Sequence, residues 1–171
     1  MLSDAAARLR QNPEALATAV LQSYWDGVLP VDPQKIARKL GVHIVQRSAW
    51  DEGWRGKSGH FHFDGTVPVI EYNTDEIETR QRFTIAHELG HFLLGDRDAP
   101  RDGPASFGSG QREPREIRAN RFAAALLMPA AAVRTLFLSG RCDSVDSLAA
   151  QFKVSKAAMG FRLANLRLVA A

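Results

Sequence analysis

The stretch RFTIAHELGHFLLGD, residues 82–96, places two histidines and a glutamate inside a run that otherwise has the composition of an apolar helix. On an α-helix, residues four apart lie on nearly the same face, so His87 and His91 can direct their imidazoles to one point. This spacing predicts two ligands of a metal ion, with Glu88 beside them as the general base. The alternative is that both histidines are partly buried helix residues held by hydrogen bonds.

A catalytic zinc needs three protein ligands and an open position for water, so another element must supply one more donor. The candidate is Glu116, in the first turn of a helix expected to begin at Pro114. Asn120 lies one turn further along, where its amide oxygen can accept a hydrogen bond from the unligated N–H of a ligand histidine. Glu113 competes for the ligand role but is expected at the helix cap. Taken alone, Glu116 is equally explained as a solvated acid favoured by the helix dipole.

Other polar side chains near the motif have weaker claims to a role. Asp96 and Asp98 follow the end of the helix, where acids commonly solvate a loop, although either one is a conceivable metal ligand. His60 and His62 share one face of an expected strand and are explained most simply as half-buried strand residues. If one of them lies near the cleft, it is a candidate to stabilise the oxyanion, and so is Tyr72.

The composition is that of an average globular domain, with 45% hydrophobic and 24% charged residues in a chain of 171. No run approaches the roughly 18 apolar residues of a membrane span, and the charged N-terminus does not resemble a signal peptide, so we expect a cytoplasmic protein with no membrane partner. The single cysteine, Cys142, excludes a thiolate-rich metal site. A formal charge of +3 is too small to indicate nucleic-acid binding by itself.

The pattern of apolar residues and breakers predicts an α+β fold. Expected helices cover 13–26, 33–40, 74–94, 114–128 and 130–140, and expected strands cover 42–46, 60–63 and 67–72. Asp64-Gly65 predicts a hairpin turn, whereas Asn73 with Glu76 resembles a capping box before a long helix that Gly95 ends. We therefore expect a helical bundle packed on a small sheet of three mostly antiparallel strands.

Two further segments complete the expected organisation. Residues 95–113 are rich in glycine, proline and charge, and we expect a long mobile loop that borders the cleft. Residues 141–171 resemble a helix-turn-helix, with helices over 145–152 and from Ser155 onwards, appended to one domain over 1–140. Five basic and two acidic residues in this segment make a weak phosphate footprint, so packing or partner docking is favoured over the alternative of DNA binding.

Two stretches carry a family resemblance. ETRQRFTIAHELGHFLLGD, residues 78–96, followed by EIRANRFAAALLMP, residues 116–129, resembles the ImmA/IrrE family of bacterial metallo-endopeptidases, and weaker likeness extends over nearly everything from residue 29 onwards. The resemblance implies a gluzincin-like, zincin-type fold with one Zn²⁺ per chain, or another divalent ion such as Mn²⁺. Many members carry a further acid two residues after the ligand glutamate, where this chain has Arg118.

The resemblance also implies roles and a partner. His87, His91 and Glu116 would bind the metal, Glu88 would activate water, and Asn120 would support the site. The expected substrate is a helix-turn-helix repressor, which the enzyme would cleave or otherwise inactivate to relieve repression of a phage, mobile-element, toxin–antitoxin or stress operon. The alternatives are a DNA-binding protein and a protein that binds its repressor without cleaving it.

Overall fold

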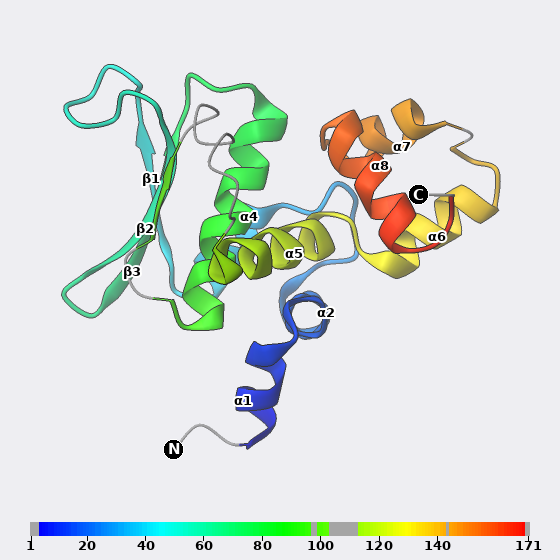
Figure 1. The fold of residues 1–171 in the computed structure, drawn as a ribbon, viewed down its shortest axis with the longest axis horizontal. Coiled ribbons are helices and arrows are strands. Elements are labelled where there is room, and N and C mark those ends of the chain that lie inside the picture. Colours follow the sequence, from blue (N-terminus) through cyan, green and yellow to red (C-terminus); the bar gives the residue numbers. More distant parts are fainter. Residues whose placement is uncertain (1–3, 97–98, 103–112, 143, 170–171) are drawn as a thin grey trace.

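A computed structural model describes residues 4–96, 99–102, 113–142 and 144–169. Within these residues, eight helices and four strands form the α+β fold that the sequence predicts (Figure 1). The helices are α1 (Asp4–Gln11), α2 (Pro13–Tyr24), α3 (Pro33–Lys39), α4 (Glu78–Leu94), α5 (Pro114–Leu127), α6 (Ala130–Leu138), α7 (Val145–Phe152) and α8 (Lys156–Asn165). The strands are β1 (His43–Arg47), β2 (Lys57–Asp64), β3 (Val67–Asn73) and β4 (Ala99–Asp102). The helix α1 was not expected.

The strands form one sheet in the order β1-β3-β2-β4. The predicted hairpin is confirmed: β2 and β3 pair antiparallel, and Gly65 between them has a φ of 60°. The sheet is nevertheless mixed, because β1 pairs with β3 in parallel, and β4 adds a fourth strand antiparallel to β2. β4 lies inside the segment expected to be a loop; its sequence, APRD, lacks an alternating apolar pattern, so pairing with β2 decides its conformation.

The helix α4 begins later than predicted. Asn73 is the last residue of β3 rather than a helix cap, and its side-chain oxygen accepts a hydrogen bond from the Asp75 N–H at 2.9 Å. The helix therefore starts at Glu78, without a side-chain cap. Its predicted end is confirmed: Gly95 has a φ of 86°, a left-handed conformation that glycine adopts without steric penalty. The N–H of the following Asp96 donates to the His91 carbonyl at 3.0 Å, so the chain folds back over the last turn.

The helix α4 lies between the sheet and the C-terminal helices α7 and α8 (Figure 1). All residues from Thr84 to His91 are buried, including both histidines and Glu88. One continuous hydrophobic core joins the sheet to the C-terminal segment; among its members are Phe61, Leu89, Phe122, Phe152 and Leu163. Because buried polar side chains require polar partners, the cluster of polar residues on α4 needs a specific explanation.

The predicted helix pair near the C-terminus forms α7 and α8. Of the expected loop over 95–113, residues 97–98 and 103–112 lie outside the described residues, and with them most of the predicted cleft border. In the described part of the chain, no single helix has the length and apolar composition to cross a membrane; by those two criteria alone, the pair α5 and α6, bent by 52°, would pass.

Candidate metal centre

The side chains of His87 and His91 on α4 and Glu116 on α5 converge on one point. The two Nε2 atoms are 3.0 Å apart, and each lies 3.2 Å from one oxygen of the Glu116 carboxylate. In a tetrahedral ion with bonds of about 2.0 Å, neighbouring ligand atoms lie about 3.3 Å apart. The observed separations are therefore close to those that a bound ion of this kind requires.

Hydrogen bonds to the Nδ1 atoms, on the side of each ring away from the group, decide which nitrogen of each histidine carries the proton. His87 Nδ1 lies 2.9 Å from the amide oxygen of Asn120, and His91 Nδ1 lies 2.8 Å from a carboxylate oxygen of Asp96. Since these oxygens only accept, each Nδ1 carries the proton and donates it. The Nε2 lone pairs then point into the group. Asn120 occupies the position predicted for it, whereas Asp96 supports a histidine instead of solvating the loop.

The chemistry of this donor set fits a cation. Two Nε2 lone pairs and two carboxylate oxygens face one another, and both histidines are only 1% exposed. It is energetically unfavourable to bury hydrogen-bond acceptors facing one another unless a proton or a metal ion lies between them. Two imidazoles and one carboxylate, with neutral rings turned by their hydrogen bonds, form a ligand set that suits zinc.

Even without a metal ion, the closeness of these groups shifts the pKa values of Glu116 and His91. Hydrogen bonds from His87 and His91 outweigh the effect of burial and hold the pKa of Glu116 far below its usual range. Burial lowers the pKa of His91, but hydrogen bonds with Glu116 and Asp96 outweigh it and raise the pKa above its usual value. The carboxylate is thus ionised at neutral pH, as a metal ligand must be.

A glycine in the motif helix brings the third ligand to the histidines. A Cβ on Gly90 would lie 3.0 Å from Cδ1 of Phe122 and 3.3 Å from both Cα and O of Ala119. Only glycine lets the backbone of α5 approach α4 so closely, and Glu116 lies in the same helix, one turn before Ala119. No helical or motif pattern in the sequence assigns this role to Gly90, although a glycine inside a helix commonly marks close packing.

A second glycine makes room for Glu88. This side chain is fully buried, and one of its carboxylate oxygens faces β2, 3.2 Å from the position that a Cβ on Gly59 would occupy. The same Cβ would lie 2.3 Å from Cγ2 of Thr84, which is a steric clash. Gly59 therefore allows α4 to rest directly on β2, with the Glu88 carboxylate enclosed between the helix and the sheet next to His87.

Two competing acids do not join the group. Glu113 is exposed at the start of α5, and its carboxylate forms an ion pair with Arg115 at 2.6 Å. Asp98 lies outside the described residues. Arg118 stands where many members of the family that the sequence resembles carry an acid, and its guanidinium donates to the Arg10 carbonyl at 2.6 Å, which ties α5 to α1.

The histidines of β2 lie on the other face of the sheet. Phe61, between His60 and His62, packs against Phe92 of α4, and successive strand residues point to opposite faces. His60 and His62 instead form a second group with Glu71, whose Oε2 lies 3.8 and 4.0 Å from their Nδ1 atoms. The structure does not bring either histidine to the His87 group.

This second group is the weaker metal candidate among the described residues. Its donor atoms are further apart than a tetrahedral zinc requires. The charge of Glu71 is already balanced by Arg47, whose Nε donates to Oε1 at 2.8 Å.

The remaining oxyanion candidate, Tyr72, has its hydroxyl between the side-chain amides of Gln34 and Gln46, which donate to it at 3.4 and 3.1 Å.

Comparisons with known proteins agree with this geometry. The model of the IrrE N-terminal-like domain family matches residues 37–164, about three quarters of the chain. The radiation response metalloprotease IrrE of Deinococcus radiodurans is 40% identical over 91 residues. That match covers 52% of this chain but only 26% of the relative, so the chain corresponds to about a quarter of the length of that protein.

Proposed function

The chain belongs to the family of IrrE N-terminal-like domains, a family of metalloproteases, and we propose that it is a zinc-dependent endopeptidase that cleaves a helix-turn-helix repressor. The observation that carries the peptidase proposal is the convergence of His87, His91 and Glu116 on one point, with Glu88 buried beside them. This combination supplies both a metal-ligand set and a base, the two requirements of metal-assisted peptide hydrolysis.

The proposed reaction divides the work between the metal group and one carboxylate. Zinc held by the three ligands would polarise the scissile carbonyl and acidify the attacking water. Glu88 accepts the proton of that water and delivers it to the departing amine nitrogen. Asn120 and Asp96 keep the histidine rings fixed during this cycle, because each accepts the Nδ1 proton of one ring.

The repressor is proposed on the family resemblance. The relative named above is described as a radiation response metalloprotease, which is consistent with a peptidase that acts in a regulatory response. Cleavage or inactivation of a helix-turn-helix repressor would release transcription of a phage, mobile-element, toxin–antitoxin or stress operon. A repressor protein encoded by a gene adjacent to the gene for this chain is the first substrate to test.

The experiment combines three proteins and two readouts. Zinc per chain and cleavage of the purified repressor, followed by intact-mass spectrometry, are measured for wild type, Glu88→Gln and Glu116→Ala. We expect Glu88→Gln to keep zinc and lose cleavage by at least about a hundredfold, the scale of general acid–base catalysis. Glu116→Ala should lose both zinc and cleavage, since it removes a ligand.

Three outcomes would contradict the proposal in different ways. Cleavage at the wild-type rate by Glu88→Gln would eliminate the proposed base. Tight binding of the repressor by zinc-loaded wild type, without any cleavage product, would instead favour the non-cleaving docking function. A wild-type chain that takes up no zinc after loading would remove the metal from the proposal altogether.

A further inference from the structure

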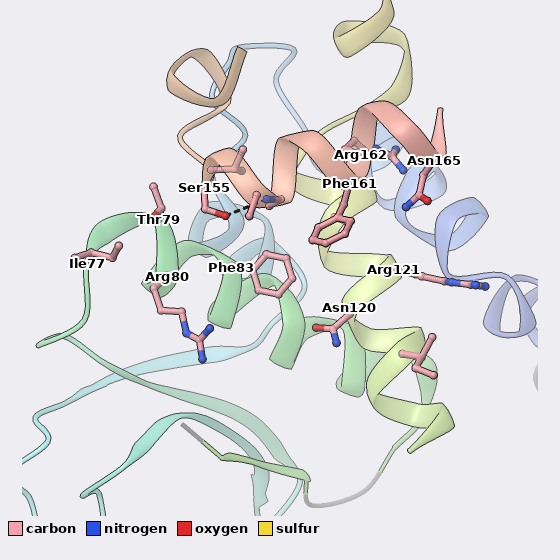
Figure 2. A pocket seen from close by; sticks show the side chains of 15 residues that line it. Ile77, Thr79, Arg80, Phe83, Asn120, Arg121, Ser155, Phe161, Arg162 and Asn165 are labelled. Atoms are coloured by element: carbon pink, nitrogen blue, oxygen red, sulfur yellow. Dashed lines mark hydrogen bonds between the residues drawn. The ribbon is translucent and has the colours of Figure 1, made fainter. Parts of the chain in front are cut away.

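A pocket of about 520 Å³ opens between α4, α5 and α8 (Figure 2). Apolar side chains from all three helices line it, and Phe83 of α4 and Phe161 of α8 lie on facing walls in Figure 2. Its volume is in the range of pockets that enclose small organic groups, which is enough room for one or two large amino-acid side chains. No step proposed above uses this pocket.

The pocket adjoins the metal group, and Asn120 and Phe83 lie between the two. Asn120 lines it, and the oxygen of the same side chain accepts the hydrogen bond from His87. Phe83 also lines it, one helical turn before His87, with the two ring centroids 6.4 Å apart. An extended peptide advances about 3.3–3.6 Å per residue, so three residues from a peptide bond at the metal group span about 10 Å, enough to extend beyond Asn120 and Phe83.

The wall from α8 includes exposed residues of the second helix of the helix-turn-helix-like pair. In DNA-binding proteins the exposed face of this helix carries polar and charged side chains that reach base edges. Here it presents Ala157, Ala158 and Phe161, and Phe161 is 73% exposed. Arg162 is buried and its Nε donates to the Met128 carbonyl at 3.0 Å, so its charge is directed inward. This face is suited to apolar contact rather than to DNA.

The charge of the lining indicates which peptide segments it accepts. The described residues that line the pocket include three arginines and no acidic side chain. Arg162 is engaged in the core, whereas Arg121 is exposed and extends from the rim of the pocket in Figure 2. Apolar segments flanked by acidic residues therefore match this surface better than basic segments do.

We propose that this pocket is the specificity site of the peptidase and takes a large apolar side chain of the substrate, located within three residues of the scissile bond. The α8 helix thus serves as a wall of the substrate site, and acidic residues next to the apolar side chain interact with Arg121. This inference rests on the proposed peptidase function, but it concerns which peptides are bound rather than whether they are cut.

The test uses a substitution that fills the pocket and a matched control. Ala157→Trp adds a large ring at an exposed position of the pocket wall, and Ala150→Trp adds the same ring at an exposed position of α7 away from the pocket. Phe161→Ala removes one wall. Each zinc-loaded protein digests a randomised peptide library, and mass spectrometry identifies the cut sites and the residues around them.

We expect wild type and Ala150→Trp to prefer Leu, Phe, Met or Trp at one position within three residues of the cut. Ala157→Trp should lower kcat/KM for these peptides by at least about tenfold, the scale of one apolar contact in a specificity pocket, and Phe161→Ala should weaken the preference. Cleavage without an apolar preference, or a preference that Ala157→Trp leaves unchanged, would overturn the inference while leaving the peptidase proposal intact.

Affinity selection from the same library by zinc-loaded Glu88→Gln separates the two proposals. If wild type cuts no peptide but the selected peptides share a large apolar residue and are lost in the Ala157→Trp, Glu88→Gln double variant, the pocket inference stands and the peptidase proposal fails. Binding of a labelled DNA duplex that Phe161→Ala abolishes would overturn the inference, since α8 would then be a DNA-reading helix.

Discussion

Gly90→Ala should weaken metal binding without touching a metal ligand. The added methyl group would lie 3.0 Å from Cδ1 of Phe122 and 3.3 Å from two backbone atoms of Ala119. Carbon atoms in favourable contact lie about 3.5–4.0 Å apart, so the neighbours must give by a few tenths of an ångström. Phe122 is fully buried and cannot swing into solvent, and Ala119 presents backbone. The helix α5 must therefore move, and it carries Glu116.

The size of the effect follows from the tolerances of metal sites. A ligand displaced by a few tenths of an ångström exceeds the roughly ±0.2 Å within which metal–ligand distances normally fall. We expect zinc affinity to fall about 10–100-fold, similar to the loss of a residue that orients a ligand. Overpacking costs about 1–3 kcal/mol, whereas replacing glycine by alanine inside a helix recovers up to about 1 kcal/mol. The metal-free protein should thus be less stable by only about 0–2 kcal/mol.

The assay is competition for zinc with a chromophoric chelator, together with urea unfolding of the metal-free protein. Gly160→Ala in α8 is the control, because among the described residues, apart from its chain neighbours and the adjacent backbone of its own helix, no atom lies within 4 Å of the position of its added methyl group. This control should gain about 0.5–1 kcal/mol of stability and keep wild-type zinc affinity. Wild-type affinity in Gly90→Ala would refute the argument that this glycine sets the distance between the ligand helices.

Three further predictions concern the surroundings of the metal group. Asp96→Ala and Asn120→Ala should each weaken zinc binding about 10–100-fold in the same competition assay, and unchanged affinity would mean that these hydrogen bonds do not orient the rings. In metal-free protein, the raised pKa of His91 adds stability that is complete below pH 6.5 and is lost as the pH rises through the folded-state pKa. The lowered pKa of Glu116 adds stability that is present above pH 4.5 and is lost as the pH falls from there towards the folded-state pKa. The urea unfolding midpoint, measured from pH 4 to 8, should therefore include a stabilising contribution that is largest between pH 4.5 and pH 6.5 and is absent in Glu116→Gln. Identical pH profiles of wild type and Glu116→Gln would contradict this prediction. Gly59→Ala should lower the Tm and abolish cleavage, because its methyl group pushes α4 away from β2, and a folded, fully active variant would show that the contact is dispensable.

Features encoded over a few neighbouring residues were predicted from the sequence. The four-residue spacing of His87 and His91, the helix end at Gly95 and the hairpin at Gly65 all depend on local geometry, and the structure has each of them. The need for a third ligand, met by an acid in the first turn of the next helix, pointed to Glu116, and the family resemblance agreed. The false helix start at Asn73 arose because the same capping pattern also forms a turn at the end of a strand.

Features that depend on contact between distant segments required the tertiary structure. The parallel pairing of β1 with β3 and the addition of β4 follow from the order of strands in the sheet, which no local pattern specifies. Asp96 looked like a loop acid until the turn at Gly95 placed it against His91. The pocket against α8 likewise exists only because three helices meet there.

The sequence by itself determined which residues can bind a metal and which helices carry them, because helical periodicity repeats within a single turn. Whether those residues meet was decided by the close approach of α4 to α5 and to β2. Gly90 and Gly59 allow this approach because a Cβ at either position would collide with the neighbouring element. Such contacts join residues about thirty positions apart, and packing in a dense core, rather than local propensity, sets their distances.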